Sequence, residues 1–192
     1  HGREPFFLYM HYMDVHQYAY DEKSSKLGFG TSLSDSYDAS IHWVDRNLGT
    51  VLGYLEENDL FANTLVVVTA DHGEAFREHG TEGHARSLYQ EVMGVPFILA
   101  LPFRLEPGVV VEPLVRNVDV WPTVLDLVGA KPEKNWRGVE APPLPGRSLV
   151  PAFARDVSVP REYLYFHHEN NRALRIGDWK EAKPHILELL SG

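Results

Sequence analysis

A dense group of ionisable side chains follows one apolar run in the middle of the chain. The stretch "VVVTADHGEAFREHGTEGH" runs from Val66 to His84, and its last fourteen residues include three histidines and four acidic residues. Carboxylates and imidazoles bind divalent cations, and imidazole also exchanges protons near neutral pH. This composition therefore indicates metal binding or acid–base chemistry at the end of a strand.

Asp71 and His72 are adjacent at the point where the apolar run ends, and Gly73 permits a sharp turn after them. From such a turn, one carboxylate oxygen and one imidazole nitrogen reach the same cation. Mg²⁺, Ca²⁺ and Mn²⁺ favour oxygen ligands, whereas an imidazole shifts the preference toward Mn²⁺ or Zn²⁺. A bare Asp-His-Gly would favour a turn cap beside a surface histidine. The preceding strand and the following histidines favour the metal, so we predict that Asp71 and His72 are metal ligands.

A second ionisable group lies near the N-terminus, after the apolar stretch 5–13. Asp14 precedes His16 by two residues, so on a strand both would share a face and the carboxylate would orient the imidazole. Taken singly, a loop histidine is more often structural. As part of two such groups, His16 and His84 are predicted to donate hydrogen bonds to an anionic substrate or to protonate a leaving group.

The elements that must position these groups alternate between strand-like and helix-like patterns, which indicates an α/β fold with a mainly parallel sheet. The β-branched run 64–70 lacks alternation and therefore predicts a strand buried on both faces. Ser34 or Asp35 is the predicted cap of the longest helix. The predicted strands span 5–13, 64–70 and 95–101, and the predicted helices span 34–60, 86–92 and 119–129.

Functional groups in open α/β sheets gather at the carboxyl ends of strands. If the strands 5–13 and 64–70 are neighbours, their two ionisable groups share one cleft. The stretch 131–151 is rich in proline and glycine and predicts irregular structure. "EYLYFHH" and "RALRIGDWK" predict two further strands, paired antiparallel in a small appended β unit.

Composition excludes several classes of partner. The chain has 192 residues and a net charge of −9, which argues against nucleic acid and anionic membranes because both require a basic patch. The longest apolar runs are too short to span a bilayer. The absence of cysteine excludes disulfides, thiolate ligands and a cysteine nucleophile from this chain, but it does not fix the compartment.

Four stretches, taken in order, resemble the sulfatase family of the alkaline phosphatase superfamily. They are "PFFLYMHYMDVH", "YDASIHWVDRNLGTVLGYLEENDLFANTLVVVTADHGE", "EHGTEGHARSLYQEVMGVPFILALP" and "NVDVWPTVLDLVGA" followed by "GRSL". The resemblance implies an alkaline-phosphatase-like α/β fold. It assigns residues 1–155 to the C-terminal part of the catalytic domain, and residues 156–192 to the start of a small C-terminal β subdomain. A periplasmic or extracellular location would accord with it.

The resemblance also implies roles for single residues. Asp71 and His72 match the second pair of metal ligands, although many sulfatases have asparagine in place of His72. His16 and His84 match residues that contact the sulfate or the leaving-group oxygen, and Asp14 is assigned to substrate binding. The implied reaction is hydrolysis of a sulfate monoester with one divalent cation. We expect Ca²⁺ first, with Mn²⁺, Mg²⁺ or Zn²⁺ as alternatives.

One part of the family pattern has no counterpart in this sequence. In members of the family, the first half of the catalytic domain contributes an aspartate pair and a Cys/Ser-x-Pro-x-Arg motif. The first residue of that motif becomes a formylglycine nucleophile. We therefore expect a fragment, inactive alone, that requires the missing N-terminal half of the domain. A phosphonate monoester or phosphodiester hydrolase is one alternative, favoured by His72. A non-catalytic sulfatase-like module is another.

Overall fold

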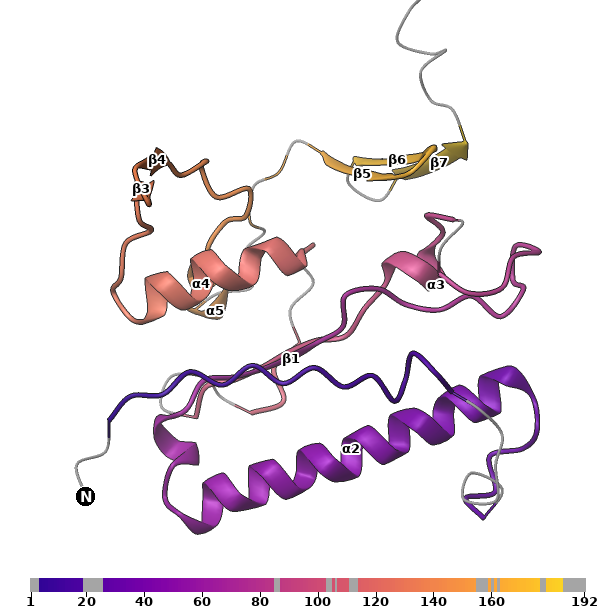
Figure 1. Cartoon of the computed structure of the whole chain (residues 1–192), viewed down its shortest axis with the longest axis horizontal. Helices are drawn as coiled ribbons and strands as arrows, with labels where there is room; N and C mark the ends of the chain where they lie inside the picture. Colours follow the sequence, from indigo (N-terminus) through magenta and orange to yellow (C-terminus); the bar gives the residue numbers. More distant parts are fainter. Residues whose placement is uncertain are drawn as a thin grey trace, which may run out of the picture. The chain divides into compact units, whose positions relative to one another are not determined.

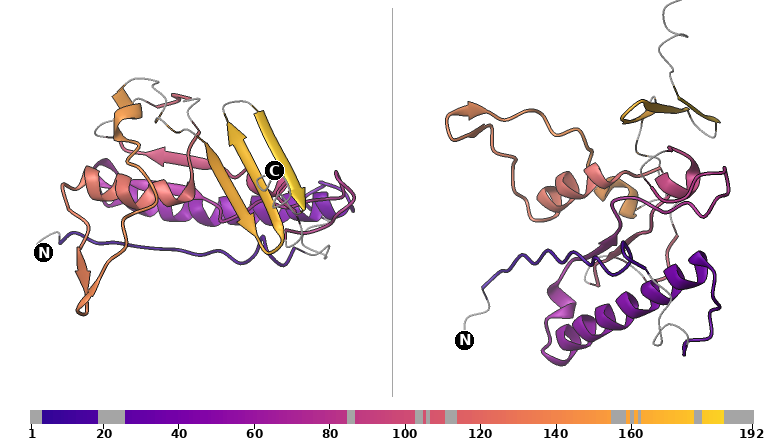
Figure 2. Two further views of the ribbon diagram at one scale, coloured as in Figure 1. Left: turned by 90° about the horizontal axis from the view of Figure 1, so that it is seen from above. Right: turned by 45° about the vertical axis from the view of Figure 1, so that its right-hand side comes forward.

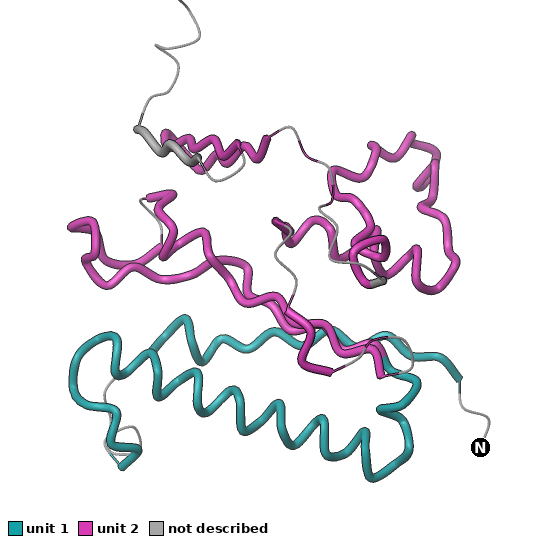
Figure 3. Tube along the Cα trace, turned by 180° about the vertical axis from the view of Figure 1, so that it is seen from behind, with its two compact units in different colours: residues 1–64 teal, residues 65–192 magenta. Residues whose placement is uncertain are grey.

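The computed structural model describes two compact units, residues 1–64 and residues 65–192 (Figure 3). The described residues are 4–18, 26–84, 87–102, 105, 107–110, 114–154, 159, 161, 163–176 and 179–184. Among them, no helix is long and apolar enough to cross a membrane.

Helix α2, Leu33–Glu57, dominates the first unit and confirms the helix predicted over 34–60 (Figure 1). Its N-cap is Ser32, so the predicted cap at Ser34 or Asp35 was wrong. The Asp35 amide donates to the Ser32 hydroxyl at 3.1 Å, and the Asp35 carboxylate accepts from the Ser32 amide at 2.8 Å. This reciprocal capping box requires the acidic residue three positions after the cap, which is why Asp35 lies inside the helix. The 3-10 turn η1, Phe61–Asn63, follows the helix.

The stretch 5–13 does not form the predicted strand. It runs as an extended trace that pairs with no strand in the described part of the chain (Figure 1). Phe7 and Tyr9 are 77% and 75% exposed. An apolar, aromatic sequence favours extended backbone, but a strand also needs a neighbour for its amides and carbonyls. The local prediction of extended conformation was therefore right, and the prediction of a strand was wrong.

The second unit begins with strand β1, Val66–Thr69, which pairs with strand β2, Phe97–Ala100. The pairing is antiparallel, with Val66 opposite Ala100 and Thr69 opposite Phe97. Both strands were predicted, but the prediction of a parallel sheet is wrong for this pair. A run of apolar residues carries no information about the direction of the neighbouring strand. The predicted burial on both faces is also wrong for β1, whose valines are half-buried and whose Thr69 is exposed. The single helical turn α3, Gln90–Met93, lies between them in sequence and is shorter than the predicted 86–92.

A helical segment then begins with the 3-10 turn η2, Asn117–Asp119, and continues as α4, Val120–Leu127. It confirms the helix predicted over 119–129. Gly129 follows the helix with a φ of 68°, the left-handed conformation that glycine adopts without strain. Asp119 is fully buried at the start of α4, which is unusual for a carboxylate.

The stretch 131–151 is largely irregular, as predicted, apart from two short antiparallel strands. These are β3, Asn135–Trp136, and β4, Val139–Glu140. The short helix α5, Val150–Ala154, follows and packs near α4.

A three-stranded antiparallel sheet lies at the yellow end of the chain (Figure 2). Its strands are β5, Leu164–His168, β6, Asn171–Ile176, and β7, Trp179–Pro184. The two predicted antiparallel strands are confirmed, and β7 completes the sheet. The boundary at 155/156 stays a prediction, since residues 155–158 lie outside the described part. The buried apolar residues described in the second unit are Ala75, Leu88, Val92, Leu101, Leu125, Leu149, Ala152, Leu164 and Ala173.

The capping box of α2 generates a prediction about Asp35. The hydrogen bond from the Ser32 side chain lowers the pKa of the Asp35 carboxyl below its ordinary value. Ser32→Ala removes this bond, so we expect the pKa of Asp35 to rise toward its ordinary value in an NMR titration of the side-chain carboxyl. Ser34→Ala makes the same chemical change inside the helix and should leave the pKa of Asp35 unaltered. Equal Asp35 pKa values in Ser32→Ala and the unmodified protein would contradict the prediction.

The same contact sets a pH dependence for α2. Because the folded pKa of Asp35 is lowered, its stabilising contribution is present above the unfolded pKa of about 3.9. The contribution is lost as the pH falls through the lowered folded pKa.

Candidate functional site

The loop after β1 is held by the segment that begins η2. The side-chain Nδ2 atom of Asn117 donates to the Ala70 carbonyl at 2.7 Å, and its Oδ1 atom accepts from the Thr69 hydroxyl at 3.0 Å. Asn117 thus binds the last strand residue and the one after it, directly before Asp71. Sequence reasoning gave Asn117 no role, because nothing in the local pattern connects it to a residue 47 positions earlier.

Gly73 makes the tightest backbone contact of this loop. Its amide donates to the Val92 carbonyl at 2.7 Å. A Cβ atom at this position would collide with the Glu91 carbonyl oxygen, so no side chain fits. The contact anchors the loop on α3, with His72 and Glu74 on either side of the anchored residue. No turn forms at Gly73 itself, and close backbone approach is the reason for glycine here.

His72, Glu74 and His84 form a cluster in which one ligand atom from each residue lies within 4.8 Å of the others. The His84 Nδ1 atom is 2.8 Å from Glu74 Oε2, and the Glu74 side chain is only 7% exposed. The His72 and His84 rings stack with centroids 4.0 Å apart. Two imidazoles and one carboxylate are a donor set that suits a divalent transition metal.

A tight loop brings His84 back to Glu74 across ten residues. Phe76 and Glu82 form an isolated antiparallel bridge, and the Gly83 amide donates to the Ala75 carbonyl at 2.9 Å. An ion pair of 2.8 Å joins the Arg77 guanidinium to the Glu82 carboxylate. The loop closes like a small hairpin, so the two cluster residues at its ends face each other.

Asp71 lies at the open edge of this cluster, with 73% of its side chain exposed. Its Oδ2 atom is 3.8 Å from His72 Nε2, and its Oδ1 atom accepts from the His72 amide at 3.1 Å. The His72 Nδ1 atom is 2.9 Å from the Gly73 carbonyl oxygen. In the tautomer that donates this bond, Nε2 carries the lone pair and is available to a cation beside the Asp71 carboxylate. The residues predicted as metal ligands thus present adjacent ligand atoms.

His79, His16 and Asp14 lie outside this cluster in the described structure. His79 stays outside the cluster, because its Nδ1 atom lies 2.7 Å from Glu91 Oε1 and its ring stacks on Tyr89 at 3.9 Å. His16 and Asp14 are exposed in a turn of the first unit, closed by a 3.1 Å bond from the His16 amide to the Met13 carbonyl. Their convergence with the second unit stays a prediction.

Sequence reasoning missed the partnership between Glu74 and His84. Glu74 was noted only as one acidic residue among several, since a separation of ten residues matches neither strand nor helix periodicity. A signal was present in Gly80 and Gly83, which adopt φ values of 78° and 85° and allow the chain to reverse. Glycines at such positions predict a turn that would return His84 to the strand end.

The chain is similar in sequence to known sulfatases. The family model described as Sulfatase matches residues 1–130. The chain is 33% identical over 136 residues to an N-acetylglucosamine-6-O-sulfatase of Bacteroides thetaiotaomicron, covering 69% of this chain and 23% of the relative. It is 31% identical over 179 residues to a steryl-sulfatase of Mus musculus, covering 86% of this chain and 27% of the relative.

Solved structures agree with the sequence matches. One, described as a complex with its substrate D-glucosamine-2-N,6-O-disulfate, superposes with a TM-score of 0.67 at 27% identity. That match covers 79% of this chain and 31% of the other. The superposition supports the predicted alkaline-phosphatase-like fold. The chain spans less than a third of the length of each of these three proteins.

The close approach at Gly73 generates a second prediction. Gly73→Ala should lower the free energy of unfolding by roughly 1–3 kcal/mol, the usual cost of overpacking, because the Glu91 carbonyl or the loop must move. Gly49→Ala is the matched control. Position 49 lies within α2 with open space around it, so the added methyl should stabilise by about 0.5–1 kcal/mol. Chemical denaturation of the full-length protein measures both changes, and a neutral Gly73→Ala would contradict the prediction.

Proposed function

Because the chain belongs to the sulfatase family, we propose that it supplies part of the active site of a sulfate monoester hydrolase. The observation that carries the proposal is the meeting of Asp71, His72, Glu74 and His84 at the end of β1. The matched relatives are named sulfatases, which supports sulfate esters over phosphonate or phosphodiester substrates.

Asp71 and His72 are the proposed ligands of one divalent cation. The separation of 3.8 Å between Asp71 Oδ2 and His72 Nε2 fits two ligand atoms that are each about 2.0–2.5 Å from a shared ion. When bound, the cation supplies positive charge to the sulfate oxygens. Ca²⁺ is our first expectation, and the imidazole keeps Mn²⁺ and Zn²⁺ as alternatives, with Mg²⁺ also among them. In the family, further ligands and the formylglycine nucleophile come from the aspartate pair and the Cys/Ser-x-Pro-x-Arg motif.

His84 is the proposed proton donor to the leaving-group oxygen. Its Nδ1 atom faces the nearly buried Glu74 carboxylate, which orients the ring and directs Nε2 away from Glu74. An imidazolium held in this way donates a hydrogen bond to the oxygen on which negative charge develops. Glu74 is a positioning residue in this scheme, since it acts through His84.

The cluster geometry also favours a second binding mode. The ligand atoms of His72, Glu74 and His84 lie close enough together to hold the cation jointly. In that mode His84 is a metal ligand and does not deliver a proton. The two modes differ in what His84→Ala and Glu74→Gln do to metal affinity.

His16 is proposed to contact the substrate sulfate, with Asp14 as a substrate-binding residue beside it. Support comes from the family resemblance of "PFFLYMHYMDVH" and from the exposure of both side chains in one turn. His16→Gln should raise KM for a sulfate ester and leave metal affinity unchanged in the full-length protein.

A further prediction separates metal binding from turnover in the full-length protein. Asp71→Ala should abolish both, because it removes a cation ligand. His84→Ala should retain the metal and slow turnover by roughly a hundredfold to ten-thousandfold, the range for loss of one general acid–base group. His167→Ala, which removes an exposed imidazole on β5, is the matched control and should change neither. Calorimetric titration with Ca²⁺, Mn²⁺ and Zn²⁺ measures affinity, and initial rates measure turnover.

The outcome of His84→Ala decides between the two binding modes. Loss of metal in His84→Ala and in Glu74→Gln would overturn the proton-donor role and assign both residues to the cation.

The last prediction for the proposed function concerns the reaction class. An aryl sulfate, an aryl phosphodiester and an aryl phosphonate monoester, assayed side by side, should show the highest kcat/KM for the sulfate. A preference for either phosphorus ester would favour the alternative hydrolase. Metal binding without turnover of any ester, in a full-length protein that carries the formylglycine motif, would favour the non-catalytic module.

A further inference from the structure

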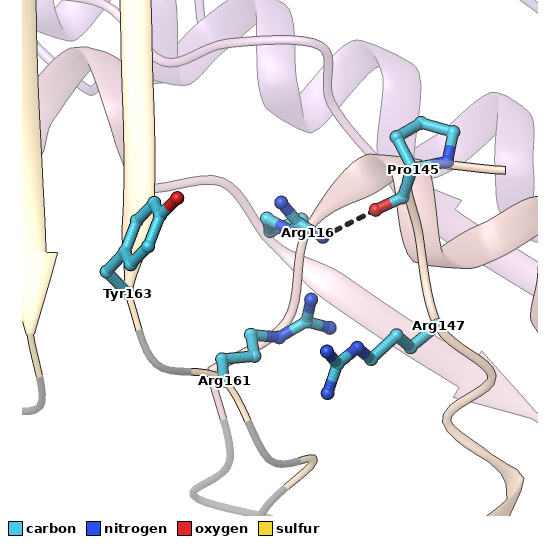
Figure 4. Close-up of a pocket in the computed structure, with 5 residues that line it drawn as sticks. All are labelled: Arg116, Pro145, Arg147, Arg161 and Tyr163. Atoms are coloured by element: carbon cyan, nitrogen blue, oxygen red, sulfur yellow. Dashed lines mark hydrogen bonds between the residues drawn. The ribbon is translucent and has the colours of Figure 1, made fainter. Parts of the chain in front are cut away.

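A hollow of about 330 Å³ lies in the second unit, and its chemistry differs from that of the histidine cluster (Figure 4). Its described lining residues are Arg116, Pro145, Arg147, Arg161 and Tyr163. Three of these five residues carry a guanidinium group, and none belongs to the proposed active site. Figure 4 shows the guanidinium groups of Arg147 and Arg161 turned toward each other, with that of Arg116 between Tyr163 and Pro145.

The three arginines are held by one buried carboxylate, that of Asp119. The Asp119 carboxylate accepts from the backbone amide of Arg116 at 2.8 Å and from that of Arg147 at 2.9 Å. It also accepts from the Arg161 guanidinium, whose side chain is only 8% exposed. The donors lie up to 42 positions from Asp119 in sequence, and their bonds converge on its fully buried side chain. The positions of the arginines therefore follow from the fold.

Arg116 retains hydrogen-bonding capacity that the described residues do not use. Its Nη2 atom donates to the Pro145 carbonyl at 2.8 Å. Its Nε atom is buried and has no hydrogen-bond partner among the described residues. A buried donor without an acceptor is unfavourable, so the described residues leave the Arg116 guanidinium incompletely satisfied.

The charge of the lining points to an anionic ligand. Two of the three guanidinium groups lie near the single Asp119 carboxylate, with Arg116 Nη2 at 3.9 Å from its Oδ1 atom. Guanidinium groups that share one hollow repel each other, and an anion between them offsets the repulsion. The forked donors of arginine match the oxygens of carboxylate, sulfate and phosphate. We propose that this arginine hollow is an oxyanion-binding site.

The arginine hollow connects to the candidate active site through consecutive residues. Arg116 lines the hollow, and the next residue, Asn117, binds the Ala70 carbonyl directly before Asp71. Two sources of the oxyanion follow from this placement, a free inorganic anion and an acidic group carried by the substrate of the proposed hydrolase. The second source rests on the proposed function, and the first does not.

The test is calorimetric titration of the full-length protein with sodium sulfate at constant ionic strength. Arg147→Ala and Arg116→Ala should each weaken sulfate binding by about tenfold, the effect of losing one charge-assisted hydrogen bond. Arg147 is exposed, and its bond to Asp119 comes from its backbone amide, so the Arg147→Ala protein should fold normally. Arg46→Ala removes an exposed guanidinium from α2 as the matched control and should bind sulfate as the unmodified protein does.

The histidine cluster is a competing place for sulfate, so the titration is repeated in His84→Ala. Binding that survives His84→Ala and falls in the two arginine variants supports the arginine hollow. Binding that is lost in His84→Ala and unchanged in both arginine variants overturns it, while the proposed hydrolase function stands. Folded arginine variants, verified by thermal unfolding, that bind sulfate normally also overturn it.

The KM values of two substrates distinguish a free anion from an acidic group of the substrate as the source of the oxyanion. An aryl sulfate and the same ester with an added carboxylate are assayed in Arg147→Ala and in the unmodified protein. If the substrate fills the hollow, KM should rise about tenfold for the carboxylate ester alone. If a free anion fills it, KM for both esters should be unchanged while sulfate binding is weakened.

Discussion

The buried carboxylate of Asp119 is the constraint that joins three separate segments of the second unit. Removing a carboxylate from water is costly unless hydrogen bonds replace its hydration. Here the amides of Arg116 and Arg147 and the guanidinium of Arg161 replace it. These bonds tie the start of η2 to the loop before α5 and to the chain that leads into β5. The Thr123 hydroxyl extends the network, since it donates to the Asp119 carbonyl and accepts from the Leu149 amide.

The candidate active site depends on that same segment. Asn117 is two residues before Asp119, and it binds the backbone at the end of β1. The carboxylate that anchors η2 therefore also sets where Asp71 and His72 emerge. Gly73 adds a second anchor through its bond to the Val92 carbonyl. These two contacts hold the backbone on both sides of Asp71 and His72, which favours binding of a cation without reorganisation of the loop.

The chain is acidic overall, yet both proposed sites are suited to anions. The net charge of −9 repels a sulfate ester at long range, so affinity must come from local groups. At the end of β1, those groups are the proposed cation and the imidazole of His84. In the arginine hollow, they are the guanidinium groups of Arg116, Arg147 and Arg161. Screening by salt limits the long-range repulsion to about 8 Å at physiological ionic strength, so local charge decides binding.

Much of the local structure could be predicted from the order of residues alone. Apolar spacing identified α2, the flanking Asp119 and Gly129 identified α4, a β-branched run identified β1, and further strand-like stretches identified β2, β5 and β6. These patterns are local because each is read over a short stretch of sequence. The Asp71–His72 pair was identifiable for the same reason, since neighbours in sequence at a strand end remain neighbours in space.

Contacts between distant segments were decided only by the folded chain. Three features leave no periodic trace in the sequence. They are the direction of the β1–β2 pairing, the lack of a strand partner for 5–13 among the described residues, and the meeting of Glu74 with His84. The arginine hollow is the clearest case, because Arg116, Arg147 and Arg161 come together through a single buried carboxylate. Each of these features depends on which segments pack together, and that is determined by burial and hydrogen bonding summed over the whole unit.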